Sequence, residues 1–180
     1  MEKNPWLTLD LQVVYNNPWI QVSHRNVINP SGGKGIYGIV HFKNLAVGVI
    51  PIDEEDHTWL VGQYRYALGR YSWEIPEGGC PLGDSPLAAA QRELREETGP
   101  QAGHWEELLR TDLSNSVTDE EGVIFVARQL SQGTATPEPT EALQLRRLPV
   151  QEAINMVLQG EITDALSVMS LLRLAMQRTG

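Results

Sequence analysis

The chain contains little cysteine and no long apolar segment. Cys80 is the single cysteine in 180 residues, which excludes an internal disulfide framework and is typical of proteins in a reducing compartment. No stretch approaches the roughly 18 apolar residues that a membrane-spanning helix requires. The first residues include Glu2 and Lys3 in place of the apolar core of a signal peptide. We therefore expect a cytoplasmic protein with no membrane partner.

Basic residues are scarce relative to acidic ones. The chain has 14 Lys and Arg against 23 Asp and Glu, a formal net charge of −9. This balance disfavours nonspecific binding to nucleic acids or to anionic membranes, since both are polyanions. A phosphate-bearing small molecule could still bind, but only with local help from metal ions and a few arginines.

The apolar pattern predicts a single α/β domain, in which helices pack against a mixed sheet. A chain of this length buries about 70 % of its unfolded surface as one domain. Two strands are expected in 11–28, broken at Asn16-Asn17-Pro18, and further strands at 36–42, 46–52, 58–66, 71–76, 105–112, 122–130 and 143–148. Helices are expected at 86–98, 150–158 and 164–178.

The last helix has an apolar stripe at helical spacing. Its members are Ala165, Val168, Met169, Leu172 and Met176. We expect this stripe to cover the core, because an amphipathic helix buries its apolar face. A partner-binding face is the alternative interpretation.

Residues 78–100 predict a glycine-containing loop that leads into a short acidic helix. Ser85 is a favourable N-cap and Pro86 suits the first helical position. Gly99 and Pro100 then end the helix. At about 100° per residue, Leu87, Ala90 and Leu94 would form one apolar stripe.

Three acids lie beside that stripe in an arrangement that is unfavourable without a positive partner. Glu93 and Glu97 would project about 40° apart, and Glu96 lies just beyond them. Like charges at i,i+4 repel, and acids at a helix C-terminus oppose its dipole. A divalent cation is the simplest source of compensation. The alternative is a solvated acidic helix end.

This segment resembles the signature box of the Nudix hydrolase superfamily. Gly78 is followed after five residues by Asp84, and after seven more by Arg-Glu-Leu-Arg-Glu-Glu-Thr-Gly at 92–99. Two identities depart from the family pattern, since Asp84 replaces a glutamate and Pro100 replaces an apolar residue. Asp84 would slightly loosen the loop, whereas Pro100 only ends the helix.

The resemblance implies a divalent metal site for Mg²⁺ or Mn²⁺. Glu93 and Glu97 are the first expected ligands, Glu96 is the third, and the main-chain carbonyl of Glu77 is a further one. Hard cations of this kind prefer several oxygen ligands, which agrees with the assignment. Arg92 is expected to pair with a box carboxylate and orient it, unless it is a plain surface arginine.

Flanking segments resemble the ADP-ribose pyrophosphatase subfamily. The relevant segments are Gly62–Tyr66, Ser72–Gly79 and Gly160–Ala165. The resemblance implies one Nudix hydrolase domain over 1–180 with an α/β/α sandwich fold and an added antiparallel strand region at the N-terminus. Residues 1–44 would supply these strands, which commonly build a homodimer in the subfamily, and 45–180 the catalytic core.

Each of three side chains outside the box could have either of two roles. Arg65 could bind a substrate phosphate or pair with a neighbouring carboxylate. Glu74 could hold a ribose hydroxyl or metal-bound water, or form a structural ion pair. Trp73 could stack on a base or belong to the core.

Enzymes of this type usually need a carboxylate that activates water, often from a late loop. We expect Glu141 to do so, and the alternatives are Glu138 and the acids of 119–121.

Together these features predict hydrolysis of a nucleoside diphosphate derivative, with ADP-ribose giving AMP and ribose 5-phosphate. A nucleotide-sugar such as GDP-mannose or ADP-glucose, or a dinucleotide, is the alternative substrate, because the box itself contacts only the diphosphate. A nucleotide-binding module without catalysis is a further alternative.

Overall fold

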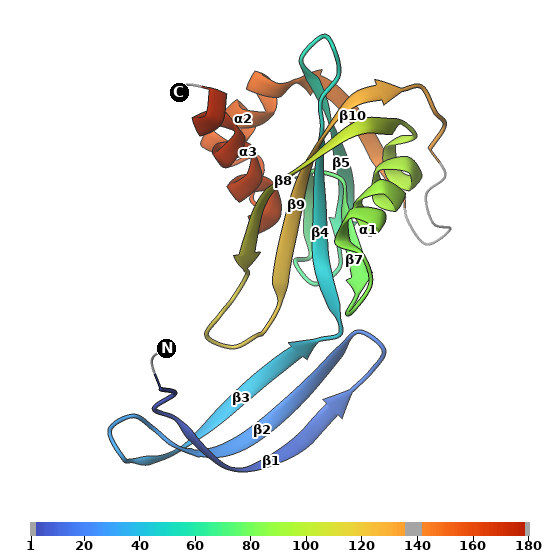
Figure 1. Cartoon of the computed structure of the whole chain (residues 1–180). Helices are drawn as coiled ribbons and strands as arrows, with labels where there is room; N and C mark the ends of the chain where they lie inside the picture. Colours follow the sequence, from blue (N-terminus) through green and yellow to red (C-terminus); the bar gives the residue numbers. More distant parts are fainter. Residues whose placement is uncertain (1–2, 136–141, 179–180) are drawn as a thin grey trace. The chain divides into compact units, whose positions relative to one another are not determined.

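The computed structural model describes residues 3–135 and 142–178 (Figure 1). The chain divides into two compact units, residues 1–44 with 112–121 and residues 45–111 with 122–180. The segment 112–121 thus belongs with the N-terminal strands, although it lies between two strands of the second unit. We describe each unit by itself.

The first unit is built on a three-stranded antiparallel sheet in the order β1-β2-β3. The strands are β1 (Leu7–Asn16), β2 (Ile20–Ile28) and β3 (Lys34–Phe42). The predicted break at Asn16-Asn17-Pro18 is confirmed, because the Asn17 side chain accepts hydrogen bonds from the backbone of Trp19 and Ile20. Side-chain capping of this kind is why asparagine favours turns.

Residues 112–121 pair with β3 through backbone and side-chain hydrogen bonds. The backbone N–H of Val40 donates to the carbonyl of Val117 at 2.9 Å. Two residues further along both segments, the N–H of Phe42 donates to the Asp119 carboxylate at 3.0 Å. These bonds fix the segment to the edge of the sheet opposite β1.

Strand β1 is solvent-exposed over its whole length in this single chain. Leu7, Leu9, Leu11, Val13 and Val14 are each at least 45 % exposed. Contiguous apolar surface of this kind is uncommon on monomers, and it often marks an interaction site.

The second unit has two sheets and the helices. One sheet, in the order β10-β5-β6, is antiparallel, and the other, in the order β7-β4-β9-β8, includes the parallel pair β4–β9. The strands are β4 (Asn44–Pro51), β5 (His57–Arg65), β6 (Arg70–Glu74), β7 (Glu77–Pro81), β8 (Gln101–Asp112), β9 (Glu121–Ser131) and β10 (Gln144–Pro149). The helical segments are α1 (Pro86–Glu93), a π-helical turn η1 (Leu94–Thr98), α2 (Val150–Leu158) and α3 (Ala165–Arg178).

The expected α/β/α sandwich with mixed strand directions is confirmed. Helix α1 lies on one side of the strands, and α2 and α3 lie on the other (Figure 1). On the α1 side, alternate residues of β4 and β9, such as Val49 and Phe125, pack with Ala90 and Leu94. These side chains are almost completely buried. This core therefore fixes α1, and with it the acids at its C-terminal end.

The expected apolar stripe of the last helix is only partly correct, because Val168, Met169 and Leu172 are half-buried but are not its most buried residues. The buried residues of α3 are Leu166, Ser167, Ser170, Leu171 and Leu174, whereas Met176 is 69 % exposed and Ala165 is exposed. At 100° per residue, the most buried face therefore lies on nearly the opposite side of the helix, about 180° from the expected stripe. Ser167 lies on this buried face, where its hydroxyl accepts a hydrogen bond from the Ile75 N–H at 2.9 Å and donates one to Asp164 at 2.9 Å. A serine satisfied in this way can be buried.

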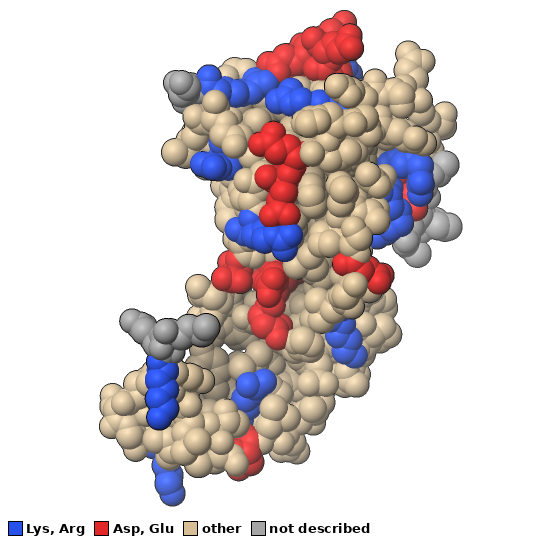
Figure 2. All heavy atoms as spheres, viewed as in Figure 1, with Lys and Arg blue, Asp and Glu red and all other residues tan. Residues whose placement is uncertain are grey.

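Acidic side chains gather on the turn between β4 and β5 (Figure 2). Arginines flank this acidic turn, since Arg147 pairs with Asp53 and Glu55, and Arg178 pairs with Asp56. None of the described helices is long and apolar enough to cross a membrane.

Candidate active site

The box begins in a strand and not in the predicted loop, because Glu77–Pro81 form β7. Gly78 faces the end of α1 so closely that a Cβ at this position would overlap with the Glu93 carboxylate. A glycine is therefore required here for the backbone to approach the acid.

Helix α1 begins at the predicted cap. The Ser85 hydroxyl accepts a hydrogen bond from the Ala88 N–H at 3.3 Å, and Pro86 occupies the first turn. The expected stripe is only partly correct, since Ala90 and Leu94 are fully buried but Leu87 is 36 % exposed. Leu87 lies in the first turn, whereas the buried cluster contacts the helix from Ala89 onward.

The helix ends in a π-helical turn over Leu94–Thr98 and not in the regular α-helix assumed from the sequence. The Thr98 hydroxyl donates to the Leu94 carbonyl at 2.6 Å, and the Gly99 N–H donates to the carbonyls of Leu94 and Arg95. Gly99 has a φ of 98°, which favours glycine. Single π-turns are rare and often occur at functional sites. Here the turn carries Glu96 and Glu97.

Arg92 lies between two of the box acids. Its guanidinium is 2.7 Å from Glu93 and 3.0 Å from Glu96, and it donates to the Gly79 carbonyl at 2.9 Å. Partial burial acts to lower the pKa of Arg92, but the negative charges of Glu93 and Glu96 outweigh it and raise the pKa. The arginine therefore supplies part of the positive charge that the acids require, and it ties α1 to β7.

Glu97 connects the π-turn to β7 from the buried side. Its side chain is only 3 % exposed, and its Oε2 accepts a hydrogen bond from the Glu77 N–H at 3.0 Å. The main chain of Glu77 therefore lies next to this carboxylate. This is the position at which the Glu77 carbonyl was expected to join the metal ligands.

A second charged group adjoins the box. Arg65 in β5 contacts the carboxylates of Glu74 and Glu77 at 2.5 and 2.6 Å. Burial acts to lower the pKa of Arg65, but hydrogen bonding to Glu74 and the charges of both acids raise it. Glu74 is 2 % exposed. Of the two roles considered for Arg65, the structure contains the carboxylate pairing.

Asp164 completes this second group and is not among the site residues predicted from the sequence. The carboxylates of Glu74, Glu77 and Asp164 lie within 4.8 Å of one another. Burial, followed by the charges of Asp164 and Glu74, raises the pKa of Glu77 well above its usual value. The signal for it in the sequence is the Gly160–Ala165 segment, whose resemblance to the subfamily does not by itself assign Asp164 a role.

The donor atoms present fit a hard divalent cation. They are carboxylate oxygens of Glu93, Glu96 and Glu97 and a main-chain carbonyl, the oxygen set that Mg²⁺ and Mn²⁺ prefer. Gly78 keeps the space beside Glu93 free of a side chain. The three box acids do not converge as tightly as Glu74, Glu77 and Asp164 do among the described residues.

The remaining expected site residues do not all lie beside the box. Trp73 is half-buried in β6 and contacts Tyr71 edge to face, with ring centroids 5.7 Å apart. Glu141 and Glu138 lie outside the described residues. The acids at 119–121 belong to the first unit, where Asp119 contacts His41 at 2.5 Å.

Comparisons with known proteins agree with the box geometry. The family described as NUDIX domain matches residues 42–169. The chain is 29 % identical to an ADP-ribose pyrophosphatase of Mycobacterium tuberculosis, over 100 % of this chain and 88 % of the relative. It is 30 % identical to a methanol dehydrogenase activator of Bacillus methanolicus, over 94 % of this chain and 92 % of the relative.

A solved structure described as an ADP compounds hydrolase superposes with a TM-score of 0.88 at 22 % identity. The match covers 100 % of this chain and 97 % of the other, so it shows the same fold. The glycine entry at Gly78, the acids on the π-turn and the family match over most of the chain lead to one conclusion: the protein belongs to the Nudix hydrolase family.

Proposed function

We propose that the protein is a divalent-cation-dependent pyrophosphatase that hydrolyses ADP-ribose to AMP and ribose 5-phosphate. The observation that carries the proposal is that the three box acids are held beside β7. Arg92 contacts Glu93 and Glu96 and donates to the β7 backbone. Glu97 accepts a hydrogen bond from the Glu77 backbone N–H. The match to an ADP-ribose pyrophosphatase over the whole chain supports the choice of substrate.

The reaction adds water across the diphosphate bridge. The oxygen of water becomes bonded to one phosphorus, the bond from that phosphorus to the bridging oxygen breaks, and the bridging oxygen leaves with the other product. Mg²⁺ or Mn²⁺ held by Glu93, Glu97, Glu96 and the Glu77 carbonyl would lower the pKa of bound water and withdraw charge from the phosphate oxygens.

The protein's own groups would fix the geometry of this site. Arg92 holds Glu93 and Glu96 through two charged contacts, so we assign it the role of orienting these acids. Glu141 remains our candidate for the group that accepts the proton of the attacking water. Arg65, Glu74 and Trp73 remain candidates for contact with the substrate.

A substrate panel tests the proposal. Purified protein would be incubated with ADP-ribose, ADP-glucose, GDP-mannose, NADH and a diadenosine polyphosphate, each with Mg²⁺ or Mn²⁺, and products resolved by chromatography. We expect ADP-ribose to give the highest kcat/KM, with AMP as a product. Preference for GDP-mannose or NADH would move the assignment to a nucleotide-sugar or dinucleotide hydrolase. Turnover of none would favour a binding module.

We also propose that the protein forms a homodimer through its N-terminal strands. The supporting observation is the exposed apolar surface of β1, which includes Leu9, Leu11 and Val13. A stable interface buries about 1,200–2,000 Å². Analytical ultracentrifugation should show a dimer, and the variant Leu11→Glu should shift it to monomer. A monomeric wild type at tens of micromolar would contradict the proposal.

A further inference from the structure

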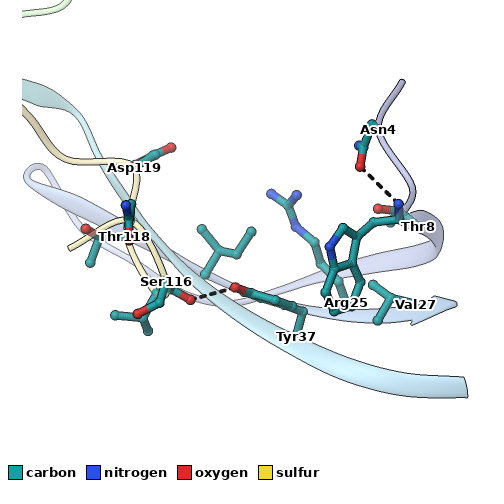
Figure 3. Close-up of a pocket in the computed structure, with 12 residues that line it drawn as sticks. Asn4, Thr8, Arg25, Val27, Tyr37, Ser116, Thr118 and Asp119 are labelled. Carbon is teal, nitrogen blue, oxygen red and sulfur yellow. Dashed lines mark hydrogen bonds between the residues drawn. The ribbon is translucent and has the colours of Figure 1, made fainter. Parts of the chain in front are cut away.

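The first unit contains a cavity that the proposed reaction does not use. Its volume is about 410 Å³, within the range of small-molecule sites. The lining comes from β1, β2, β3, the residues before β1, and the returning segment 115–119 (Figure 3). All of these residues belong to one compact unit, and none belongs to the box.

One wall of the cavity is aromatic. The rings of Trp6 and Tyr37 meet edge to face with centroids 5.4 Å apart and an interplanar angle of 89°. The Tyr37 ring is fixed by its hydroxyl, which donates to the Ser116 carbonyl at 2.7 Å, and the backbone N–H of Trp6 donates to the Asn4 side chain at 3.0 Å (Figure 3). Val27 and Ile39 add apolar surface.

Arg25 contributes a positive charge to the same face of the sheet. It lies directly opposite Tyr37 in the register of β2 and β3, and cross-strand neighbours share a face. The side chain is partly buried. Its Nε donates to the Ser23 hydroxyl at 3.3 Å, and no carboxylate of the described residues lies within ion-pair distance of its guanidinium.

This arginine differs from most others in the chain. Seven described arginines contact at least one acid, namely Arg65, Arg92, Arg95, Arg110, Arg146, Arg147 and Arg178. Asp119, the acid that lines the cavity, already accepts bonds from His41 and from the Phe42 N–H. The guanidinium therefore faces the cavity as a charge that an anion could neutralise.

We propose that this cavity binds a small planar aromatic anion, whose ring lies against Trp6 and Tyr37 and whose carboxylate or phosphate contacts Arg25. Aromatic pairs prefer edge-to-face or offset arrangements, which an incoming ring could adopt with these two side chains. A planar guanidinium presents two parallel N–H groups to such an anion, and charged hydrogen bonds of this type are the stronger ones. The site is separate from the proposed hydrolysis.

Calorimetric titration of the full chain tests the proposal. The phosphate arm uses AMP and the carboxylate arm uses indole-3-carboxylate, both in EDTA so that no divalent cation recruits the anion to the acids of the box. Their neutral counterparts, adenosine and indole-3-carboxamide, test the need for the anion. We expect at least one anion to bind the wild type ten or more times more tightly than its counterpart, and the arm that binds identifies the anionic group.

Variants locate the site. Arg25→Gln and Trp6→Ala should each weaken that binding at least tenfold, whereas Arg173→Gln, on an exposed arginine of α3, should leave it unchanged. Unchanged affinity of the anion for Arg25→Gln overturns the proposal, because that anion would then be bound elsewhere on the protein. So does failure of both anions to bind the wild type, or equal binding of the neutral compounds. These last two outcomes do not depend on whether a variant folds.

Discussion

Gly78 and Glu93 occupy adjoining space, because any Cβ at position 78 would coincide with the Glu93 carboxylate. Gly78→Ala must therefore displace this acid from β7. We expect hydrolysis to fall about 10- to 100-fold, the loss typical when the support of a metal ligand is removed.

Activity at several Mg²⁺ concentrations measures the effect. The matched control is Gly38→Ala, since a Cβ there would meet nothing within 4 Å. Full activity in Gly78→Ala would show that Glu93 is not needed in its observed position.

Glu97→Gln removes a charge but keeps an oxygen that can accept the Glu77 N–H. We expect the fold to remain intact and the turnover to fall at least about 100-fold, because a carboxylate ligand would be lost. Circular dichroism and kcat report these two quantities. Glu106→Gln, on an exposed acid of β8, serves as the control. Wild-type turnover in Glu97→Gln would remove this residue from the proposed metal ligands.

Arg65→Met leaves two carboxylates near one another without their cation. Removing one partner of a buried ion pair costs about 3 kcal/mol or more. Because Arg65 is one-third exposed, we expect a loss at the low end of that range, measured by urea unfolding.

The double variant Arg65→Met with Glu74→Gln separates the two roles of Arg65. Recovery of stability without recovery of KM would show that the Arg65–Glu74 pair also contacts substrate. Recovery of both would assign it a structural role alone.

The buried face of α3 makes a stability prediction. Leu171 is fully buried, and Leu171→Ala should lower the free energy of unfolding by about 2–5 kcal/mol. Met176 is 69 % exposed, and Met176→Ala should change it by less than about 0.5 kcal/mol. Thermal or urea unfolding measures both changes. A larger loss of stability in Met176→Ala than in Leu171→Ala would favour the stripe expected from the sequence.

The acidic turn makes a pH prediction. Hydrogen bonding to Arg178 lowers the pKa of Asp56 below its model-compound value of 3.8. A lowered carboxyl pKa contributes stability above 3.8, and that contribution disappears as the pH falls through the lowered value. The pair is largely solvent-exposed, so we expect a contribution of about 0.5 kcal/mol at pH 7.

In Arg178→Gln, the loss of stability relative to wild type should therefore be larger at pH 7 than near pH 2. Arg173→Gln, on the same helix, should show no such pH dependence. An equal loss at both pH values in Arg178→Gln would assign the effect to packing and not to charge.

Local signals predicted much of the second unit. The helix at 150–158 has the expected bounds, because an amphipathic pattern begins and ends clearly there. Ser85 caps α1 as predicted, since capping depends on residues within one turn. The box spacing identified the family for the same reason.

Features that depend on distant residues could not be predicted. The burial of Ser167 requires the Ile75 N–H, 92 positions away along the chain. The pairing of Arg65 with Glu74 and Glu77 requires β5 and β6 to form a hairpin beside β7. The π-turn at 94–98 is set by packing and by Gly99, and a pattern of 3.6 residues per turn does not reveal it.

The return of residues 112–121 to the first unit has a consequence for recombination of this protein. A splice after Asn44 would transfer the three strands but leave behind Val117 and Asp119, which bond to the backbone of Val40 and Phe42. The recipient's own loop would have to supply both bonds. Exchange of the whole N-terminal unit between relatives therefore requires transfer of both 1–44 and 112–121, which takes three junctions, and a chimera made at the single junction after Asn44 combines strands and a loop segment from different parents.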